Sequence, residues 1–430
     1  MENLNNTLLR QNKHWQKNYK KNNYVNRELI KNINFNSKFI EIITGIRRSG
    51  KSTILNILID NLIFNKNIEP KSILSINFDS PTFIPYYRKV QNLYDIINQA
   101  EVLLDRKIKY LFFDEIQNIE LWEKWIKEVY DEKIFKKIIL TGSNSQLLES
   151  QYISRLSGRY FSHVNFPFSF KEYLTIKKID YQLNEIDNYP IQHKLIKAFK
   201  DYLKVGGFPE VLIDNNSNIL ESYYKTIILK DVIDNNQIKQ KTTLKELAYY
   251  LITNYTSFFS YNKLSKNLHT NENTLQEYIE HLKNSYIFSD LKKFDYSIKK
   301  QNINNKKIYC IDNGLINQIA FNFSKDEGKL LENYVFIELS RRQSDLFYYS
   351  NSFECDFLIK EGSKITQAIQ VCYDLNKNNE KREINGLIKV MNKYNLNQSI
   401  IINQKRDETI KIDNKKIVLV PAWKWSLENY

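Results

Sequence analysis

A glycine-bounded basic loop, preceded by an apolar strand pattern and followed by an apolar helix pattern, contains the residues with the clearest chemical purpose. The loop reads Gly45-Ile46-Arg47-Arg48-Ser49-Gly50-Lys51-Ser52, and Thr53 continues into the helix pattern. Glycines let backbone N–H groups surround phosphate oxygens, and the helix N-terminus adds positive potential. Lys51 can then reach the β- and γ-phosphates of ATP, and the Ser52 hydroxyl can ligate Mg²⁺. The pattern predicts a nucleotide-binding site at residues 45–53.

A second apolar strand pattern ends in two carboxylates, in the run Lys109-Tyr110-Leu111-Phe112-Phe113-Asp114-Glu115. Asp114 is predicted to hold Mg²⁺ directly or through water. Glu115 is predicted to be the general base that polarises the attacking water. A further strand candidate at residues 72–78 lies between the loop and the acidic strand in the sequence. An extra strand between these two motifs is typical of NTPases with a catalytic glutamate.

Polar residues that follow the next strand pattern, at residues 137–141, are candidates for sensing the γ-phosphate. Ser143 or Asn144 would lie near the phosphate and the water, although Gly142-Ser143-Asn144 also suits a turn followed by a helix cap. Arg155 and Arg159 are arginine-finger candidates, because charge on the transferring phosphoryl group needs a rigid cation. A structural salt bridge or a solvated side chain is an equal alternative for each arginine.

Taken together, these motifs resemble a large family of AAA-type ATPases that carry a C-terminal restriction-endonuclease-like domain of unknown function. The resemblance spans about residues 40–425. Its marks are Gly45–Ser52, Phe113-Asp114-Glu115-Ile116-Gln117, Thr141-Gly142-Ser143, Arg155-Leu156-Ser157-Gly158-Arg159, Pro167-Phe168-Ser169-Phe170, Gly206-Gly207-Phe208-Pro209-Glu210, Leu229-Lys230-Asp231 and Ile311-Asp312-Asn313-Gly314-Leu315. The resemblance implies ATP binding and hydrolysis and leaves the biological role open.

The expected fold class is α/β, and the chain length of 430 residues favours several domains. We expect an N-terminal extension (1–35), a P-loop ATPase core of AAA type (36–167) and a helical lid (168–240). A winged helix-turn-helix (241–318) and a restriction-endonuclease-like α/β domain (325–430) are expected to follow.

The expected recognition helix of the winged helix is poorly suited to reading DNA. Its exposed positions include Glu272, Glu277 and Glu280, which would repel phosphates, whereas recognition helices usually carry Arg or Lys. The wing that follows is basic and leaves contact with the DNA backbone open. Its lysines are Lys292, Lys293, Lys299, Lys300, Lys306 and Lys307. Packing or contact with a protein partner is the favoured role of this domain.

The C-terminal pattern α-β-β-β-α-β resembles the restriction-endonuclease-like core. Glu354, Asp356 and Gln370 form a candidate second metal site, with Glu332 or Glu338 as a further acid from the helix. Cys372 stands where the family's motif has its catalytic lysine, and a neutral thiol cannot orient water or balance developing charge. Lys360 or Lys364 are alternative sources of a cation. We therefore expect a degenerate nuclease-like fold, with an active nuclease as the alternative.

Composition narrows the remaining function classes. Lys and Arg number 63 against 49 Asp and Glu, a net charge of +14, which leaves DNA contact through a basic surface open. Three cysteines and five scattered histidines exclude a disulfide framework and a zinc-binding pattern. The polar N-terminal residues contain no signal-peptide pattern and no apolar run suits a membrane span, so a cytoplasmic protein is expected. Oligomerisation stays open.

The sequence therefore predicts an ATP hydrolase that requires Mg²⁺ and whose turnover moves the winged-helix and nuclease-like domains. Two alternatives from other classes stay open. One is a metal-dependent DNA nuclease gated by ATP, which requires Glu354, Asp356 and Gln370 to converge with a lysine. The other is a slow nucleotide switch that assembles protein partners.

Overall fold

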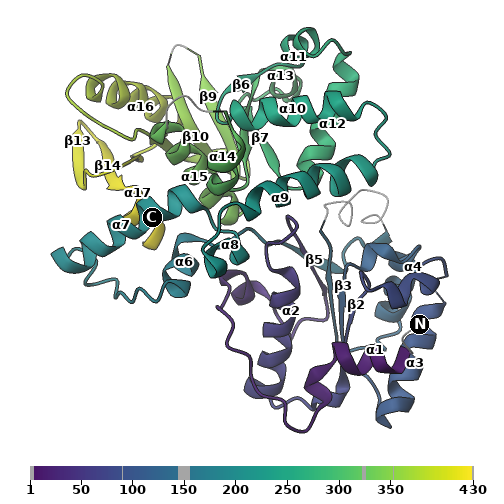
Figure 1. The fold of residues 1–430 in the computed structure, drawn as a ribbon. Helices are drawn as coiled ribbons and strands as arrows, with labels where there is room; N and C mark the ends of the chain where they lie inside the picture. Colours follow the sequence, from purple (N-terminus) through teal and green to yellow (C-terminus); the bar gives the residue numbers. More distant parts are fainter. Residues whose placement is uncertain (1–3, 90, 144–154, 322–325, 352, 429–430) are drawn as a thin grey trace. The chain divides into compact units, whose positions relative to one another are not determined.

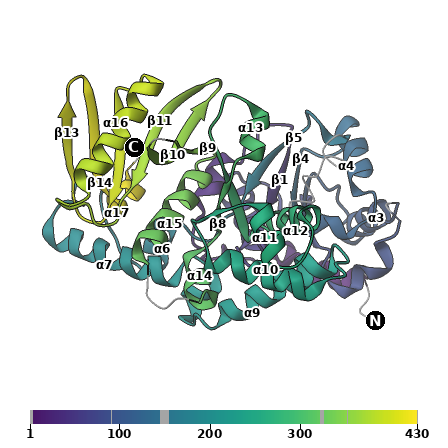
Figure 2. The same cartoon turned by 90° about the horizontal axis from the view of Figure 1, so that it is seen from above.

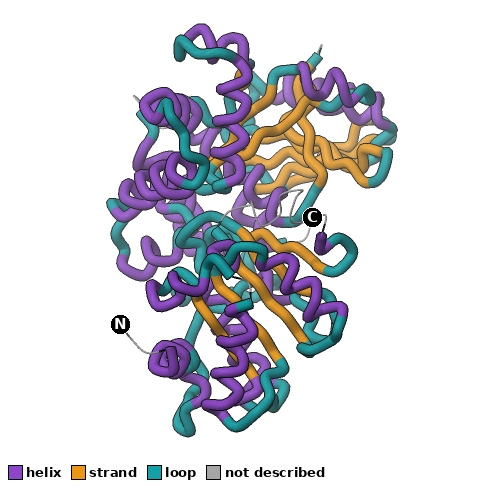
Figure 3. Tube along the Cα trace, turned by 90° about the vertical axis from the view of Figure 1, so that its right-hand side faces the viewer, coloured by secondary structure: helices purple, strands orange, loops and turns teal. Residues whose placement is uncertain are grey.

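The chain folds into two compact units, each built around its own β-sheet. The computed structural model describes residues 4–89, 91–143, 155–321, 326–351 and 353–428. The first unit is Met1–Asn165 and the second is Phe166–Tyr430. Figure 3 shows the strands of the chain gathered into these two sheets. Among the described residues, no helix has both the length and the apolar character needed to cross a bilayer.

The sheet of the first unit is parallel and has the strand order β2-β3-β4-β1-β5. Its strands are β1 (Ile40–Thr44), β2 (Ile73–Asn77), β3 (Tyr110–Asp114), β4 (Lys137–Thr141) and β5 (Tyr160–Val164). The strand expected at residues 72–78 is β2, but it lies at the sheet edge beyond β3. The expected strand between the two motifs along the chain is therefore present, and in the sheet β4 separates β1 from β3.

Both faces of this sheet are buried, which explains the continuous apolar runs of its central strands. One face packs on α2 (Lys51–Asp60) through a cluster that includes Ile43, Phe112 and Ile139. The other face packs on α3 (Asn92–Leu104) and α4 (Trp122–Asp131), with Ile42 and Phe113 in that cluster. Figure 1 shows α2 on one side of the sheet and α3 and α4 on the other. Successive side chains alternate between the two cores, as a pleated strand requires.

The N-terminal segment is part of this unit, because α1 (Leu4–Gln11) and the turn after it cover the free edge of β2. Asn12 Oδ1 accepts a hydrogen bond from Ser75 N at 2.7 Å, and Trp15 Nε1 donates to Ile73 O at 2.8 Å. Side chains thus satisfy backbone groups that an edge strand would otherwise expose.

The second unit begins with helices. They are α6 (Phe170–Ile176), α7 (Tyr189–Val205), α8 (Pro209–Asp214), α9 (Ile219–Thr226), a π-helical continuation at Ile227–Asp234, and α10 (Lys241–Thr253). Next come α11 (Tyr261–Asn267) and α12 (Glu272–Asn284), whose N-termini are capped by the side chains of Ser260 and Asn271. These caps satisfy backbone N–H groups in the first turn and fix where each helix begins.

A sheet of nine strands unites the rest of the second unit, in the order β13-β14-β12-β11-β10-β9-β7-β8-β6. The strands are β6 (Phe258–Phe259), β7 (Phe288–Lys293), β8 (Lys306–Cys310), β9 (Asp345–Ser350), β10 (Glu354–Glu361), β11 (Lys364–Val371), β12 (Gln398–Asn403), β13 (Glu408–Ile412) and β14 (Lys415–Pro421). The parallel pair β7–β9 joins the segment expected as a winged helix to the segment expected as nuclease-like.

Helices cover this second sheet along its length, as Figure 2 shows. They are α13 (Ile298–Ile303), α14 (Asn313–Ile319), α15 (Glu327–Arg341), α16 (Glu380–Tyr394) and α17 (Ala422–Leu427). Apolar residues of α16, including Leu387 and Met391, form one core with Leu358 and Ile401 of the strands. Helix α15 contacts β8, β9 and β11, so it packs against both parts of the sheet.

A buried ion pair lies inside the sheet of the first unit. Lys137 Nζ donates to Glu41 Oε1 at 2.7 Å and to the carbonyls of Asn34, Ser37 and Phe39 at 2.7, 3.1 and 2.7 Å. His163 Nε2 lies 2.7 Å from Glu41 Oε2. Burial lowers the pKa of Lys137, opposed by the hydrogen bond to Glu41.

Replacing Lys137 by Met should destabilise the first unit by about 3 kcal/mol, because it leaves a buried carboxylate and several carbonyls without their cation. Urea denaturation of the full chain measures this cost. The matched control is Lys136→Met at an exposed neighbouring lysine, which should unfold like the parent protein. Equal midpoints for the two variants would contradict the stabilising role of this pair.

Candidate functional site

The loop at residues 45–52 connects β1 to α2 and curls at the carboxyl edge of the sheet. Gly45 and Gly50 have φ angles of +139° and +93°, which disfavour residues with a side chain. A Cβ at Gly45 would also lie 2.2 Å from the carbonyl oxygen of Asn165. Lys51 Nζ donates to the carbonyls of Gly45 and Ile46 at 2.9 and 3.1 Å. The ammonium group therefore lies inside the curve of the loop.

The other loop residues differ in exposure. Ile46 and Ser49 are buried, Arg47 and Thr53 are half-buried, and Arg48 and Ser52 are exposed. Arg48 has a φ of +67°, so a non-glycine residue of the loop also adopts the left-handed conformation. The exposed Ser52 begins α2 together with Lys51 and points its hydroxyl at β3.

Asp114, the last residue of β3, accepts hydrogen bonds from the residues that follow or end the neighbouring strands. Its side chain accepts hydrogen bonds from Ser52 Oγ at 2.6 Å and from Thr141 Oγ1 of β4. Burial, and then the charge of Glu115, raise the pKa of Asp114, while the bonds from Ser52 and Thr141 oppose the rise. A hydroxyl and a carboxylate thus meet where the loop, β3 and β4 end.

Glu115 follows Asp114 directly and turns the opposite way from the strand, with a φ of +55°. Its Oε2 accepts hydrogen bonds from Ser143 N and Oγ at 3.2 and 3.1 Å, and from Gln117 Nε2. The backbone N–H of Glu115 donates to Thr141 Oγ1 at 3.3 Å. The structure thus brings the predicted base and one predicted sensor residue together at the edge where the loop lies.

The remaining candidates from the nucleotide motifs lie apart from this contact. Asn144 is outside the described residues. Arg155 pairs with Glu123, and Arg159 Nε and Nη2 donate to Asp131 at 2.8 and 3.2 Å. Both arginines form salt bridges inside their own unit, and a finger role for either stays a prediction.

Sequence reasoning missed three polar residues that hold the loop and the acidic strand. Thr141 belongs to a motif of the resemblance but had no predicted role of its own, yet its hydroxyl donates to Asp114 and accepts the N–H of Glu115. Arg27 Nη1 donates to Ser49 O at 2.9 Å, and Asn165 Nδ2 donates to Ser49 O and Oγ at 2.9 and 3.0 Å. Arg27 and Asn165 carry no motif of their own, and only the fold brings them to the loop.

A second polar cluster lies in the nine-stranded sheet, where acids from α15 and β10 surround a lysine. Lys307 Nζ is 3.0 Å from Glu332 Oε1, 3.0 Å from Asp356 Oδ1 and 3.7 Å from Glu354 Oε1. The sequence had placed Lys306 and Lys307 on a basic wing. Both are buried because they lie on β8, which corrects that expectation. Burial, and then the charge of Asp356, raise the pKa of Glu332 to about 7.

Of the other residues expected near this cluster, only Gln370 contacts one of its acids. Gln370 Oε1 accepts from Asp356 N at 3.2 Å, and Gln370 Nε2 donates to Glu383 Oε2 at 3.0 Å. Glu338 is a buried partner of Arg341, at 3.2 Å from its Nε. The other named side chains engage elsewhere: Lys360 pairs with Asp345, and Cys372 Sγ contacts Asn379 Nδ2 at 3.6 Å. Lys364 is an exposed residue at the start of β11.

Comparison with known families identifies the class of the first unit. A model described as an AAA domain matches residues 37–174. Two domains of unknown function match the rest, DUF8612 at residues 196–326 and DUF4143 at residues 327–425. The first unit is accordingly an AAA-type P-loop NTPase domain, with the parallel sheet and loop described above, and this class implies nucleotide binding.

Two curated proteins match nearly the whole chain. The uncharacterized protein MJ1544 of Methanocaldococcus jannaschii is 33% identical, with 95% of this chain and 92% of that protein covered. An uncharacterized protein of Haemophilus influenzae is 30% identical, with 90% of this chain and 94% of that protein covered. The chain belongs to the family of these two proteins.

Solved structures are similar at a much lower level. The AMPPCP-bound DnaA of Aquifex aeolicus is 15% identical, with 63% of this chain and 93% of that chain covered and a TM-score of 0.30. The Orc1 protein of Aeropyrum pernix in complex with DNA is 10% identical, with 69% and 88% covered and a TM-score of 0.29. Scores at this level support no conclusion about ligands or partners.

Replacing Lys51 by Ala should abolish ATP binding while the chain stays folded, because the ammonium group faces the loop interior rather than an apolar core. Titration with a fluorescent ATP analogue measures binding, and circular dichroism checks the fold. Lys66→Ala, at an exposed lysine of the same unit, is the matched control and should bind like the parent. Unchanged affinity in Lys51→Ala would refute the assignment of this loop.

Proposed function

We propose that this protein binds ATP and hydrolyses it with the help of Mg²⁺. The observation that carries the proposal is the meeting of three groups at one edge of the parallel sheet. They are the glycine-bounded loop with Lys51, the Ser52–Asp114 contact and the Glu115–Ser143 contact. Each has the chemical type that phosphoryl transfer to water requires, namely phosphate ligands, hard oxygen donors and a carboxylate base.

The donor set fits a magnesium ion, because Ser52 Oγ and an oxygen of Asp114 lie 2.6 Å apart and both are hard oxygen ligands. Mg²⁺ would neutralise charge on the β- and γ-phosphates when bound. The loop N–H groups and Lys51 would bind those phosphates, and Glu115 would accept the proton of the attacking water. Ser143 would hold the Glu115 carboxylate in place and respond to the γ-phosphate.

Glu115→Gln should bind ATP like the parent and hydrolyse it ~10²–10⁴-fold more slowly, because the amide keeps the shape and loses the basicity. Phosphate release at saturating ATP is the measurement. Glu120→Gln, an exposed acid a few residues further on, is the control and should leave turnover unchanged. Turnover of Glu115→Gln equal to that of this control would assign the water to another group.

The second unit is proposed to contain a winged helix and a restriction-endonuclease-like core. Helices α11 and α12 followed by the antiparallel strands β7 and β8 support the first assignment. Helix α15, the antiparallel strands β9, β10 and β11, helix α16 and the parallel strand β12 support the second. Both remain proposals about fold type and imply no activity by themselves.

DNA is proposed as a partner only through its backbone. The burial of Lys306 and Lys307 removes charge from the expected wing, and Glu277 and Glu280 of α12 pair with His281 and Lys283 on the helix itself. A basic group with more exposed charge lies in the first unit, around a cavity of about 300 Å³. Its cations are Arg106, Lys107, Lys109 and Lys136. Such a cluster attracts phosphates without reading bases.

Turnover is proposed to drive movement of the second unit through the covalent connection after β5. Asn165, the last residue of the first unit, bonds Ser49 of the nucleotide loop, and its N–H donates to Thr44 O at 2.7 Å. The next residues are held by Arg341 of α15. Its guanidinium lies 5.1 Å from the Phe166 ring and donates to Pro167 O at 3.0 Å. A displacement of the loop would therefore reach α15 along three consecutive residues.

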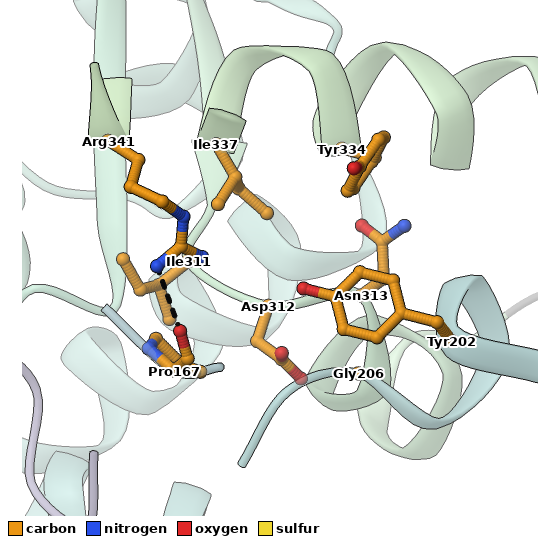
Figure 4. A pocket seen from close by; sticks show the side chains of 9 residues that line it. All are labelled: Pro167, Tyr202, Gly206, Ile311, Asp312, Asn313, Tyr334, Ile337 and Arg341. Carbon is orange, nitrogen blue, oxygen red and sulfur yellow. Dashed lines mark hydrogen bonds between the residues drawn. The ribbon is translucent and has the colours of Figure 1, made fainter. Parts of the chain in front are cut away.

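On the second unit's side, this segment lies next to a group of backbone hydrogen bonds around Asp312. Asp312 accepts backbone hydrogen bonds from Gly207 at 2.7 Å and Gly314 at 2.9 Å, and a Cβ at Gly206 would lie 2.1 Å from Asp312 Oδ1. Figure 4 shows Asp312 and Arg341 with the Arg341–Pro167 bond around a cavity of only about 10 Å³. That space suits at most one water molecule, so the junction serves as structure rather than as a ligand site.

Asn165→Ala should retain ATP binding and lose the response of the second unit to ATP, because Ser49 of the loop loses its side-chain hydrogen bonds to the connecting segment. Hydrogen exchange in the Glu115→Gln background at saturating ATP measures that response at residues 166–170 and 338–342. Asn118→Ala, whose amide bonds Phe78 O at 3.3 Å, is the control and should keep it. An undiminished response in Asn165→Ala would rule out this route.

A further inference from the structure

The carboxylates of the nine-stranded sheet point at an ammonium group rather than at an open cation site. Lys307 Nζ touches Glu332 from α15 and Asp356 from β10, both at 3.0 Å, and Glu354 at 3.7 Å. The side chain of Lys307 is 5% exposed, that of Asp356 9% and that of Glu332 16%. Two acids and one cation are therefore almost wholly shielded from solvent, and only Glu354 is open.

Two of the acids in this cluster also accept hydrogen bonds from other groups within the chain. Asp356 Oδ2 accepts from Val371 N at 3.0 Å, and Glu332 Oε1 also accepts from Tyr309 OH at 2.8 Å. Gln370 turns its carbonyl oxygen to the backbone of Asp356. Within the described ranges, no group of three or more His, Cys, Asp or Glu side chains could hold a metal ion. Both oxygens of Asp356 and both polar atoms of the Gln370 amide, two of the three expected ligands, are thus engaged within the chain.

We infer that the ammonium group of Lys307 holds the position of a divalent cation in this cluster, which makes it an internal ion pair rather than a metal centre. The distances of 3.0 Å are those of hydrogen bonds between an ammonium and carboxylates. Mg²⁺ would need its oxygen ligands at about 2.1 Å and would have to displace the ammonium from two buried acids.

The same contacts argue against a role for Lys307 in assisting hydrolysis. A lysine that assists hydrolysis must direct its N–H groups at water or at developing negative charge. Lys307 instead donates to the acids that would have to hold the metal. Its strand, β8, lies in the DUF8612 match, whereas α15 and β10 lie in the DUF4143 match. The charge pair therefore joins the two matched segments across the sheet.

The test counts Mn²⁺ ions bound to the full chain by electron paramagnetic resonance without nucleotide. Wild type and Asp356→Asn should bind equal numbers, because the cluster contributes no site. Lys307→Met should bind one ion more than wild type, since removing the ammonium exposes the acids. The double variant Lys307→Met with Asp356→Asn should lose this ion again. Its control is Lys306→Met, the neighbouring lysine of β8, which lies 3.3 Å from Asp290 outside the cluster and should gain nothing.

Two results would overturn the inference. The first is a Mn²⁺ ion on wild type, or cleavage of DNA with Mn²⁺, that disappears in Asp356→Asn. The second is a folded Lys307→Met variant that gains no ion, since the acids would then not surround a cation position. If Lys307→Met fails to fold, the comparison of wild type with Asp356→Asn decides the matter. All of these outcomes are independent of ATP hydrolysis.

Discussion

The hydrogen bonds to the Asp114 carboxylate are the constraint on which the geometry of the first unit depends. Ser52 reaches Asp114 from the loop after β1, and Thr141 reaches it from β4, so one buried acid ties three strand ends together. Burying that charge is costly unless it is paired with donors, and the two hydroxyls provide them. The parallel sheet makes this possible because the carboxyl ends of β1, β3 and β4 meet at one edge.

At that edge, further hydrogen bonds fix the position of Glu115 and of Asn165, the last residue of the first unit. Thr141 also accepts the N–H of Glu115, which turns the glutamate out of the strand and toward Ser143. On the other side of the loop, the Asn165 amide bonds Ser49, and its backbone carbonyl leaves no room for a Cβ at Gly45. A displacement of the loop would thus move Asp114 and its neighbour Glu115 through the Ser52–Asp114 bond. It would move the connecting segment through the Asn165–Ser49 bond.

The nucleotide motifs could be predicted because they depend on local spacing. The loop must follow a strand and precede a helix, and Asp114 must end a strand, so type and position together were enough. Arg27, Thr141 and Asn165 could not be predicted, since their contacts depend on how distant segments meet. The strand at residues 72–78 was predictable as a strand between the two motifs along the chain, but its place at the sheet edge was not, since β4 lies between β1 and β3 in the sheet. Order along the chain is a poor guide to order in a parallel sheet, because each crossover can pass over a neighbour.

The burial of Lys307 is the clearest case of a feature that depends on distant segments and could not be predicted from the sequence. The residues before it are asparagines and Lys306, which is typical of a solvated surface. The apolar run Ile308-Tyr309-Cys310 follows it, so the sequence indicates a strand but gives no sign that Lys307 itself is buried. The residue becomes buried because β8 joins a sheet whose acids are supplied from Glu332 and Asp356, dozens of positions away. A buried lysine is tolerated only with such partners, and buried acids equally need their cation. The cysteine at position 372 and the lysine at position 307 therefore belong to one arrangement: with Lys307 as the cation, Glu332 and Asp356 have their counter-charge although position 372, directly after β11, holds a cysteine.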